Sequence, residues 1–364
     1  MIKEQFFFIG TEAELIKVFP VILECQSNGD ICNIIASGQN DISNSRIVSL
    51  INLSGEFVEL SKEETIKKSA GGLLKWFIDT RLKAIGIIAE HFNVDKLKEC
   101  NIIVHGDTVS TFMGALIGRK LKMRVCHVEA GLRSHNLFNP FPEEIDRLLT
   151  SSIARLHFAP GDIAEKNLVN TKGKVINTIQ NTLIDSLEYS KDVPLNSDEI
   201  KNLLEEDYFV FVMHRQENLV DAEFVKEIVT RVIKLSKDKK CVMIMHTITR
   251  NTFEKLGLMN ELCSSPNICL LSRVDYFDFM KLLNSSKFVI TDGGSNQEEL
   301  YYMNKPTLIL RKTTERQEGI GVNARLFDGS SYDLIRFVES IEYNESQEIA
   351  NMHPSRIIAE ELSR

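Results

Sequence analysis

Short apolar runs alternate along the chain with longer stretches in which apolar residues recur at helical spacing. The runs at 5–10 (QFFFIG) and 31–37 (ICNIIAS) have the length and hydrophobicity of buried strands. Between them, residues 11–26 have the pattern of a helix. Because strands that alternate with helices form parallel sheets covered by helices, this pattern predicts an α/β protein.

The stretch 102–127 contains one complete unit of this pattern. We expect a strand at Ile102–Val104, a polar turn, a helix at Ser110–Lys120 and a second strand at Arg124–His127. In open sheets of this kind, ligands bind beyond the carboxyl ends of the strands. The polar residues that follow these strands are therefore the first candidates for a functional site.

Carboxylates occupy three positions on the same predicted edge of the sheet. Asp107 follows the first strand, Glu129 follows the second, and Glu143 and its neighbour Glu144 come after a proline-rich turn. A structural interpretation competes at two of these positions, because Asp is a preferred helix cap and acids favour the first turn of a helix. Glu129 is a charge that ends an apolar strand before a glycine turn, which favours a functional role.

The alternation of strands and helices restarts after a polar, charged stretch near 178–206. We expect two doubly wound Rossmann-like domains, residues 1–178 and 179–352, with an active-site cleft between them. The later strands are expected at 208–213, 241–245, 268–272, 288–292 and 306–310.

His214 follows the apolar strand at 208–213 directly and precedes Arg215. A titratable imidazole is therefore expected beside a fixed cation at a sheet edge. An isolated histidine is more often structural, but this neighbourhood favours a functional one.

A glycine turn follows the predicted strand that ends at residue 292. Gly293 and Gly294 let the backbone approach a ligand, and Ser295 and Asn296 start a helix. Free backbone N–H groups at such a helix start suit a diphosphate. Gly10 lies in a similar turn, but a single Gly-Thr pair is a weaker signal.

Charged residues surround this predicted diphosphate site. Carboxylates at Glu298 and Glu299 would repel a diphosphate, so one of them is expected to hold sugar or ribose hydroxyls. Arg311 and Arg316 follow the next strand and are cations suited to phosphate.

Composition narrows the possible partners. The 364 residues suffice for two domains, and a net charge of -8 with a pI near 5.6 argues against a nucleic-acid partner. The seven cysteines lack the paired spacing of metal ligands, which favours buried thiols in a reducing compartment. With no apolar run of membrane-spanning length and no signal-like N-terminus, we expect a cytoplasmic protein without a membrane partner.

An ordered series of motifs resembles the UDP-N-acetylglucosamine 2-epimerases. The motifs run in the family's order from residue 10 to about 320: GDT, HVEAGLR, PFPEEIDR, HFAP, NTLID, MHRQEN, TDGGSNQEE and RKTTER. The resemblance implies a GT-B type fold, a homodimer and a role in surface-polysaccharide synthesis. It also implies that a C-terminal helix, residues 353–364, completes the first domain, and the periodicity there suits a helix.

The family's reaction gives the candidate residues roles. It removes UDP from C1 with loss of the C2 proton, and then reprotonates C2 on the opposite face of a 2-acetamidoglucal intermediate and returns UDP. By resemblance, Asp107, Glu129 and Glu143 match the essential carboxylates and His214 matches the essential histidine. We assign proton transfer at C2 to Asp107 and Glu129, and contact with the diphosphate to His214. No nicotinamide cofactor or metal is required, and the UDP contacts are expected from Lys17, Gly294, Ser295, Glu299 and Arg311.

Several positions depart from the family pattern. Glu12 stands where the family has an arginine that reaches the nucleotide, and Asn40 stands where histidine is usual. Gly293 replaces a serine, Gln180 replaces a glycine, and a histidine-containing segment keeps only His246. Some of these regions form an allosteric UDP-N-acetylglucosamine site in bacterial members, so that regulation is not expected here.

Four functions remain open from the sequence. The leading one is a non-hydrolysing epimerase of a UDP-2-acetamido sugar, which the GDT turn favours. A hydrolysing epimerase would release a free 2-epimerised sugar and UDP. A glycosyltransferase on the same fold would leave the three matched carboxylates unexplained, and a binding protein without catalysis would leave the catalytic set unexplained.

Overall fold

The chain folds into two compact units, residues 1–186 with 351–364, and residues 187–350. The computed structural model describes residues 3–62, 70–137, 141–311, 318–327, 329–330, 333–340 and 352–364. The domain assignment made from the sequence, 1–178 with 353–364 and 179–352, stays a prediction.

The first unit is built on a parallel sheet with seven strands among the described residues. Its strand order is β3-β2-β1-β4-β5-β6-β7, so the order reverses between β1 and β4. The strands are β1 (Glu4–Ile9), β2 (Ile31–Ala36), β3 (Phe57–Glu59), β4 (Asn101–His105), β5 (Arg124–Val128), β6 (Leu156–Ala159) and β7 (Lys174–Asn177).

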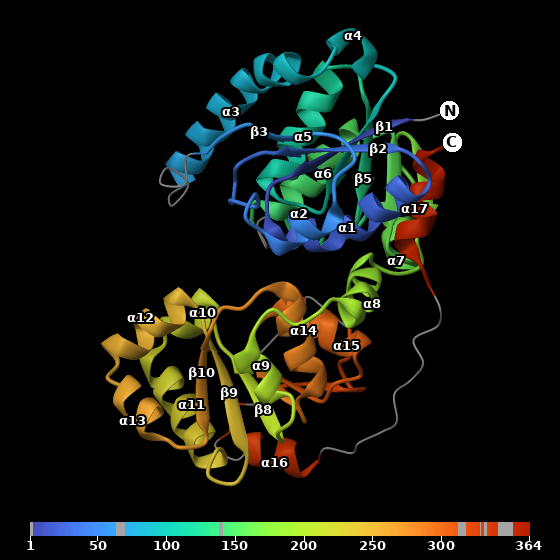
Figure 1. Ribbon diagram of the computed structural model, residues 1–364. Coiled ribbons are helices and arrows are strands. Elements are labelled where there is room, and N and C mark those ends of the chain that lie inside the picture. Colours follow the sequence, from blue (N-terminus) through green and yellow to red (C-terminus); the bar gives the residue numbers. More distant parts are fainter. Residues whose placement is uncertain are drawn as a thin grey trace. The chain divides into compact units, whose positions relative to one another are not determined.

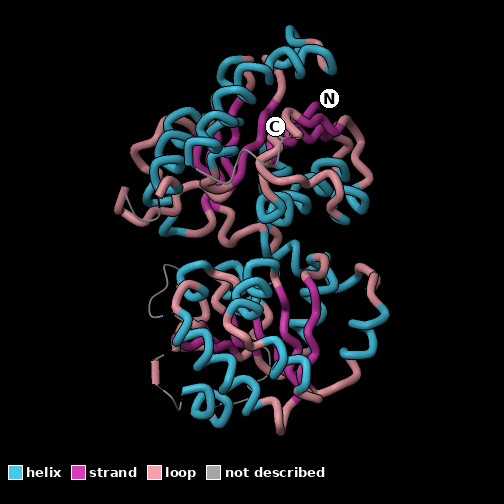
Figure 2. Tube along the Cα trace, turned by 90° about the vertical axis from the view of Figure 1, so that its left-hand side faces the viewer, coloured by secondary structure: helices cyan, strands magenta, loops and turns pink. Residues whose placement is uncertain are grey.

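Helices flank the strands in each unit, as Figure 2 shows. In the first unit, the helix expected at 11–26 is α1 and the helix expected at Ser110–Lys120 is α5. The helices are α1 (Glu12–Ser27), α2 (Arg46–Ile51), α3 (Ala70–His91), α4 (Val94–Leu97), α5 (Val109–Lys120), α6 (Glu143–Ile153), α7 (Asp162–Asn167) and α8 (Leu183–Asp192), which continues into the second unit.

The C-terminal helix α17 (Pro354–Leu362) packs against the first unit (Figure 1). The carbonyl of Leu362 accepts a hydrogen bond from Asn101 Nδ2 at 3.2 Å, and Lys174 Nζ reaches Glu361 Oε1 at 2.6 Å. The end of the chain therefore lies beside the amino ends of β4 and β7.

The second unit repeats the architecture with a parallel sheet of six described strands. Its order is β10-β9-β8-β11-β12-β13, which reverses between β8 and β11. The strands are β8 (Tyr208–Val212), β9 (Lys240–Met245), β10 (Ile268–Ser272), β11 (Val289–Thr291), β12 (Thr307–Ile309) and β13 (Ala324–Leu326).

Some helices of the second unit begin at a residue whose side chain caps them. Ser197 accepts the N–H of Ile200 and caps α9, and Asp221 caps α11 in the same way. The helices are α9 (Asp198–Leu203), α10 (Gln216–Leu219), α11 (Ala222–Leu235), α12 (Thr247–Lys255), α13 (Met259–Ser264), α14 (Tyr276–Ser285), α15 (Gly294–Tyr302) and α16 (Asp333–Glu339).

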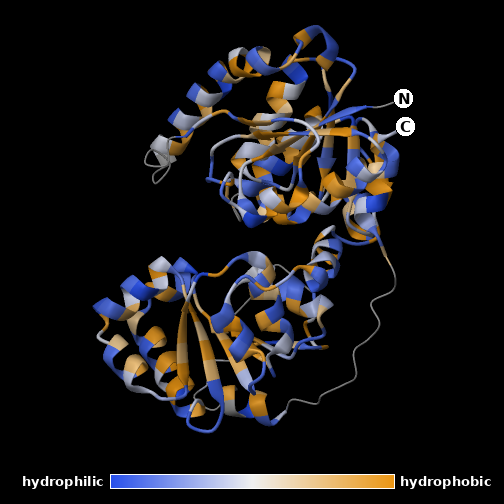
Figure 3. Cartoon of the chain, in the orientation of Figure 1, coloured by the Kyte–Doolittle hydropathy of each residue, from blue (hydrophilic) through white to orange (hydrophobic). Residues whose placement is uncertain are grey.

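The apolar strands form the core of each unit (Figure 3). Phe6, Phe8 and Val104 are fully buried in the first unit, and Phe209 and Phe211 are fully buried in the second. Burial on both faces of a parallel sheet explains why these strands are continuous apolar runs. Among the residues that the structure describes, no helix is long and apolar enough to cross a membrane.

The strand orders locate the candidate residues. In open α/β sheets a crevice forms where the order reverses, at the carboxyl ends of the strands. In the first unit this point lies between the turns after β1 and β4, and in the second between the turns after β8 and β11. Asp107 follows β4, His214 follows β8 and Gly293 follows β11, so each of the two reversal points carries predicted site residues.

Candidate functional site

Asp107 lies in the turn after β4 but does not cap α5, the helix that follows. Thr108 is the N-cap of α5, and its side chain and that of Thr111 each bond the other's backbone N–H in a capping box. The competing interpretation of Asp107 as the helix cap is therefore wrong, because its neighbour satisfies the helix start. Gly106 turns the chain with a φ of 70°, and its carbonyl accepts from His127 Nε2 at 2.8 Å.

The turn after β1 is filled by a carboxylate of the chain itself. Glu14 Oε2 accepts the N–H of Gly10 at 2.7 Å, and Glu14 Oε1 accepts from the hydroxyl of Thr108. Glu14 is 3% exposed, and burial raises its pKa although these hydrogen bonds oppose the shift. Glu14 thus ties together the two turns at the reversal point and occupies the N–H that made Gly10 a weak phosphate candidate.

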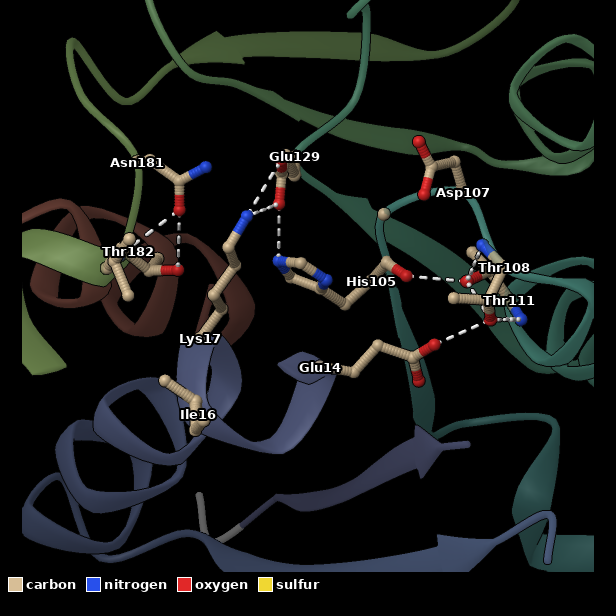
Figure 4. Close-up of polar contacts among 12 residues, drawn as sticks. Glu14, Ile16, Lys17, His105, Asp107, Thr108, Thr111, Glu129, Asn181 and Thr182 are labelled. Carbon is tan, nitrogen blue, oxygen red and sulfur yellow. Dashed lines mark hydrogen bonds and ion pairs between the residues drawn. The ribbon is translucent and has the colours of Figure 1, made fainter. Parts of the chain in front are cut away.

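Glu129 lies in a buried group of charges (Figure 4). Its carboxylate accepts from Lys17 Nζ of α1 at 2.8 and 3.0 Å, and His105 Nε2 at the end of β4 lies 2.9 Å from Glu129 Oε2. The side chains of all three are between 5% and 9% exposed. Lys17, which the sequence assigned to UDP, therefore holds Glu129 in this structure.

The backbone of Glu129 adopts the left-handed conformation, with a φ of 61°. Residues other than glycine rarely adopt it, and it costs on the order of 1–3 kcal/mol unless its surroundings compensate. The two hydrogen bonds from Lys17 and the proximity of His105 provide that compensation.

Asp107 is bound by an arginine that the sequence analysis did not single out. Arg147 Nε donates to Asp107 Oδ2 at 2.9 Å, and Arg147 Nη1 donates to Glu144 Oε2 at 3.1 Å. Burial alone would lower the pKa of Arg147, but Asp107 and Glu144 raise it above its ordinary value. The cation therefore links the turn after β4 to the first turn of α6.

Glu143 and Glu144 occupy the first turn of α6, as the sequence predicted. Glu144 also accepts the N–H of Ser134 at 2.9 Å and is buried, so it acts as a structural partner of Arg147. The Oε2 atom of Glu143, in contrast, is buried and has no hydrogen-bond partner among the described residues. The two glutamates thus differ, because Glu144 is tied to Arg147 whereas Glu143 Oε2 receives no donor from the described residues.

In the second unit, Asp292 organises the turn after β8. This fully buried carboxylate accepts the N–H of His214 at 3.0 Å, the N–H of Arg215 at 2.9 Å and Nδ2 of Asn218 at 3.1 Å. Burial would raise the pKa of Asp292, but the hydrogen bonds and charge of His214 hold it below its ordinary value. Asp292 therefore stays ionised beside His214.

His214 is held between this carboxylate and a second histidine. Its Nδ1 lies 3.3 Å from Asp292 Oδ1, and its ring stacks on His246 at a centroid distance of 4.8 Å. Burial and the charges of His214 and Arg273 lower the pKa of His246 to about 4. The neutral His246 ring thus supports His214, which is 35% exposed and accessible to a ligand.

The glycine turn after β11 leads directly into α15. A Cβ atom at Gly293 would lie 2.5 Å from Asn296 Oδ1 and 3.0 Å from His214 Cε1, so a larger residue here would displace the Asn296 amide. The N–H of Gly293 donates to Thr291 Oγ1 at 3.0 Å, and no side chain caps the helix. The N–H groups of the first turn, including those of Gly294 and Ser295, have no intrahelical partners and suit an anion.

The remaining predicted contacts of the second unit are placed as follows. Arg215 lies 3.5 Å from Glu217 Oε1, and Glu299 is 5% exposed and accepts from Asn296 Nδ2 at 3.0 Å. Arg311 is half-buried just after β12, and Arg316 lies outside the described residues. Within the parts of the chain that the structure describes, no group of three His, Cys, Asp or Glu side chains is arranged to hold a metal ion.

Three partners of the candidate residues escaped the sequence analysis: His105, Arg147 and Asp292. The sequence contained an indication of each of these three residues. His105 and Asp292 are polar residues at the ends of apolar strands, and Arg147 lies three residues after Glu144 on the same helix.

A family model and a known relative that match this chain carry the same description. A family model described as UDP-N-acetylglucosamine 2-epimerase matches residues 81–356. The UDP-N-acetylglucosamine 2-epimerase of Neisseria meningitidis serogroup A is 30% identical over 378 residues, which cover 97% of this chain and 97% of that protein.

Solved structures agree with this match. The N. meningitidis UDP-GlcNAc 2-epimerase bound to UDP-GlcNAc has a TM-score of 0.77 and 29% identity, with 100% of both chains covered. The Methanocaldococcus jannaschii UDP-GlcNAc 2-epimerase in complex with UDP-GlcNAc and UDP has a TM-score of 0.76 and 27% identity, with 100% of this chain and 99% of that chain covered. They confirm the expected GT-B type α/β fold with its two Rossmann-like sheets. The chain therefore belongs to the UDP-N-acetylglucosamine 2-epimerase family of nucleotide-sugar isomerases.

Proposed function

We propose that the chain is a non-hydrolysing epimerase that inverts C2 of UDP-N-acetylglucosamine or a related UDP-2-acetamido sugar. UDP leaves C1 as the C2 proton is removed, which gives a 2-acetamidoglucal intermediate. C2 then receives a proton on its opposite face and UDP returns to C1. The two bond changes at C2 need a base and an acid, and the departing diphosphate needs cations or N–H donors.

The observation that carries the proposal is the placement of Asp107 and Glu129. They follow β4 and β5, which are neighbouring strands paired from Asn101 with Arg124 to His105 with Val128. Each carboxylate is held by a cation of its own, Arg147 or Lys17. Two separately oriented carboxylates at one sheet edge suit proton transfer on two faces of a sugar ring, with Glu143 as the third carboxylate of the site.

The second unit supplies the groups that would hold UDP. We assign the departing diphosphate to His214 and to the free N–H groups at the start of α15. For Lys17, the bond to Glu129 favours a role in orienting that carboxylate. The further contacts proposed for UDP are Arg215, Gly293, Gly294, Ser295, Asn296, Glu299, Arg311 and Arg316.

The relatives support the substrate class. The N. meningitidis structure contains UDP-GlcNAc, and the M. jannaschii structure contains UDP-GlcNAc and UDP. We extend this substrate class to the present chain by its similarity along the whole length. The homodimer stays a prediction from the family resemblance.

The reaction is tested by incubating the protein with UDP-N-acetylglucosamine in deuterated water and following the sugar by proton NMR. We expect a UDP-linked manno sugar with deuterium at C2, because the abstracted proton exchanges with solvent before C2 is reprotonated. Heat-treated protein is the control.

Each other outcome has a defined meaning. Free sugar together with UDP would identify the hydrolysing reaction instead. Absence of exchange with UDP-N-acetylglucosamine and with other UDP-2-acetamido sugars would contradict epimerisation.

The substitution Glu12→Arg is expected to tighten UDP binding. Glu12 is the first residue of α1 and accepts from Ser45 Oγ at 3.5 Å, so it places a negative charge where the family has an arginine. Replacing repulsion of the diphosphate by a charge-assisted hydrogen bond should lower the Kd for UDP on the order of tenfold, measured by calorimetry.

Glu99→Arg is the matched control, since Glu99 is exposed in the same unit just before β4, at the opposite edge of the sheet. It makes the same change of net charge and should leave the Kd unaltered. Weaker UDP binding by Glu12→Arg would show that Glu12 contacts another part of the substrate.

A further inference from the structure

A stripe of polar side chains runs along α6, from the half-buried Glu143 to the buried Asp146 and Thr150. Glu143, Asp146 and Thr150 are spaced by three and four residues, so they lie on one face of the helix. Asp146 is 6% exposed and Thr150 is fully buried. Arg147 and Glu144 lie beside this stripe and bond each other instead.

The carboxyl groups of Glu143 and Asp146 each have one oxygen that accepts no hydrogen bond from the described residues. Glu143 Oε2 and Asp146 Oδ2 are buried and have no hydrogen-bond partner among the residues that the structure describes. Side chains three residues apart on a helix are neighbours, with Cβ atoms about 5–6 Å apart. Two ionised carboxylates at this spacing, each with a buried oxygen, would repel each other, whereas one proton between them would satisfy both oxygens.

We propose that Asp146 is a positioning residue for Glu143, and that the two side chains share one proton in an O–H···O hydrogen bond during turnover. Asp146 provides the hydrogen and Glu143 Oε2 accepts it. The bond fixes the carboxyl group of Glu143 at the edge where Asp107 lies. This inference rests on the proposed function, because Glu143 is one of the three carboxylates assigned to the reaction.

The electrostatic surroundings agree with a protonated Asp146. Burial, the charge of Glu143 and the charge of Asp107 raise the pKa of Asp146 to about 7. The pair should therefore hold its proton below neutrality and lose it as the pH rises through about 7.

Two arginines near α6 already have hydrogen-bond partners. Arg147 bonds Asp107 and Glu144, and Arg133, which precedes α6 in the chain, donates to Leu132 O and Ser151 Oγ. The neighbouring helix α5 has its cations, Arg119 and Lys120, in its last turn. Asp146 Oδ2 receives no hydrogen bond from any described residue, so we assign the proton shared with Glu143 as its partner.

Two substitutions of Asp146 separate positioning from packing. Asp146→Asn keeps an N–H donor for Glu143 but has no titratable proton. We expect kcat of the unaltered protein to fall above pH 7. The Asp146→Asn variant should lack this fall, and its kcat at pH 6 should be reduced less than about fivefold. Asp146→Leu has a similar size and no donor, so kcat should fall at least about tenfold at every pH with little change in KM.

Asp95→Asn is the matched control, because Asp95 is an exposed acid in the first turn of α4 in the same unit. Its pH profile should equal that of the unaltered protein. The proposal would be overturned if Asp146→Asn and Asp146→Leu lost kcat equally and Asp146→Asn retained the fall above pH 7.

A titration without turnover separates this inference from the proposed function. With ¹³C-labelled aspartate side chains, NMR should show one carboxyl signal that titrates near pH 7 and disappears in Asp146→Asn. If that signal is present but no UDP sugar is epimerised, the shared proton stands and the proposed reaction fails. If no aspartate titrates near pH 7, the shared proton is refuted whatever the activity.

Discussion

The Asp107→Asn variant is expected to lose exchange of the C2 proton by at least about 10²-fold while it retains UDP binding. Asparagine can still accept a hydrogen bond from Arg147, which Asp107 contacts at 2.9 Å, so the turn after β4 should keep its shape. It cannot take up a proton at neutral pH. Deuterium incorporation at C2 and calorimetric titration with UDP measure the two quantities separately.

Asp207→Asn is the matched control for this experiment. Asp207 also forms an ion pair, with Lys287 Nζ at 2.8 Å, but it precedes β8 and lies at the amino end of its strand. Its loss should leave C2 exchange unchanged. Full activity in a folded Asp107→Asn variant would remove Asp107 from the mechanism.

The second large effect is expected from Glu129→Gln, which should both abolish C2 exchange and destabilise the first unit. Lys17 would keep a buried ammonium without its counter-charge, since its side chain is only 9% exposed. Breaking a buried ion pair from one side typically costs about 3–5 kcal/mol. Urea unfolding should therefore show a lower midpoint for Glu129→Gln.

The double variant Glu129→Gln/Lys17→Met distinguishes catalysis from stability. Removing both charges should recover at least about half of the lost free energy of unfolding, because no buried charge is left unpaired. C2 exchange should remain absent. Recovery of exchange in the double variant would mean that Glu129 acts only as a partner of Lys17.

Much of the fold followed from the sequence because parallel strands buried on both faces must be continuous apolar runs. The strands predicted at 102–104 and 124–127 are the observed β4 and β5 within two residues at either end. The same logic put Asp107 and Glu129 at one sheet edge, since the carboxyl ends of neighbouring parallel strands lie together. The identity of the helix cap did not follow, because Asp107 and Thr108 are both good caps and only the backbone geometry selects Thr108.

By itself, the sequence determined the α/β class, the family and the carboxylates and histidine at the strand ends, because these depend on local periodicity and on motifs contiguous in the chain. Only the tertiary structure decided which cation or acid each of them meets. Lys17 reaches Glu129 across 112 positions and Arg147 reaches Asp107 across 40. Such pairings depend on the strand order, which brings distant turns together at the point where that order reverses. The hydrophobic pattern cannot decide the order, because one pattern is compatible with many strand orders in a parallel sheet.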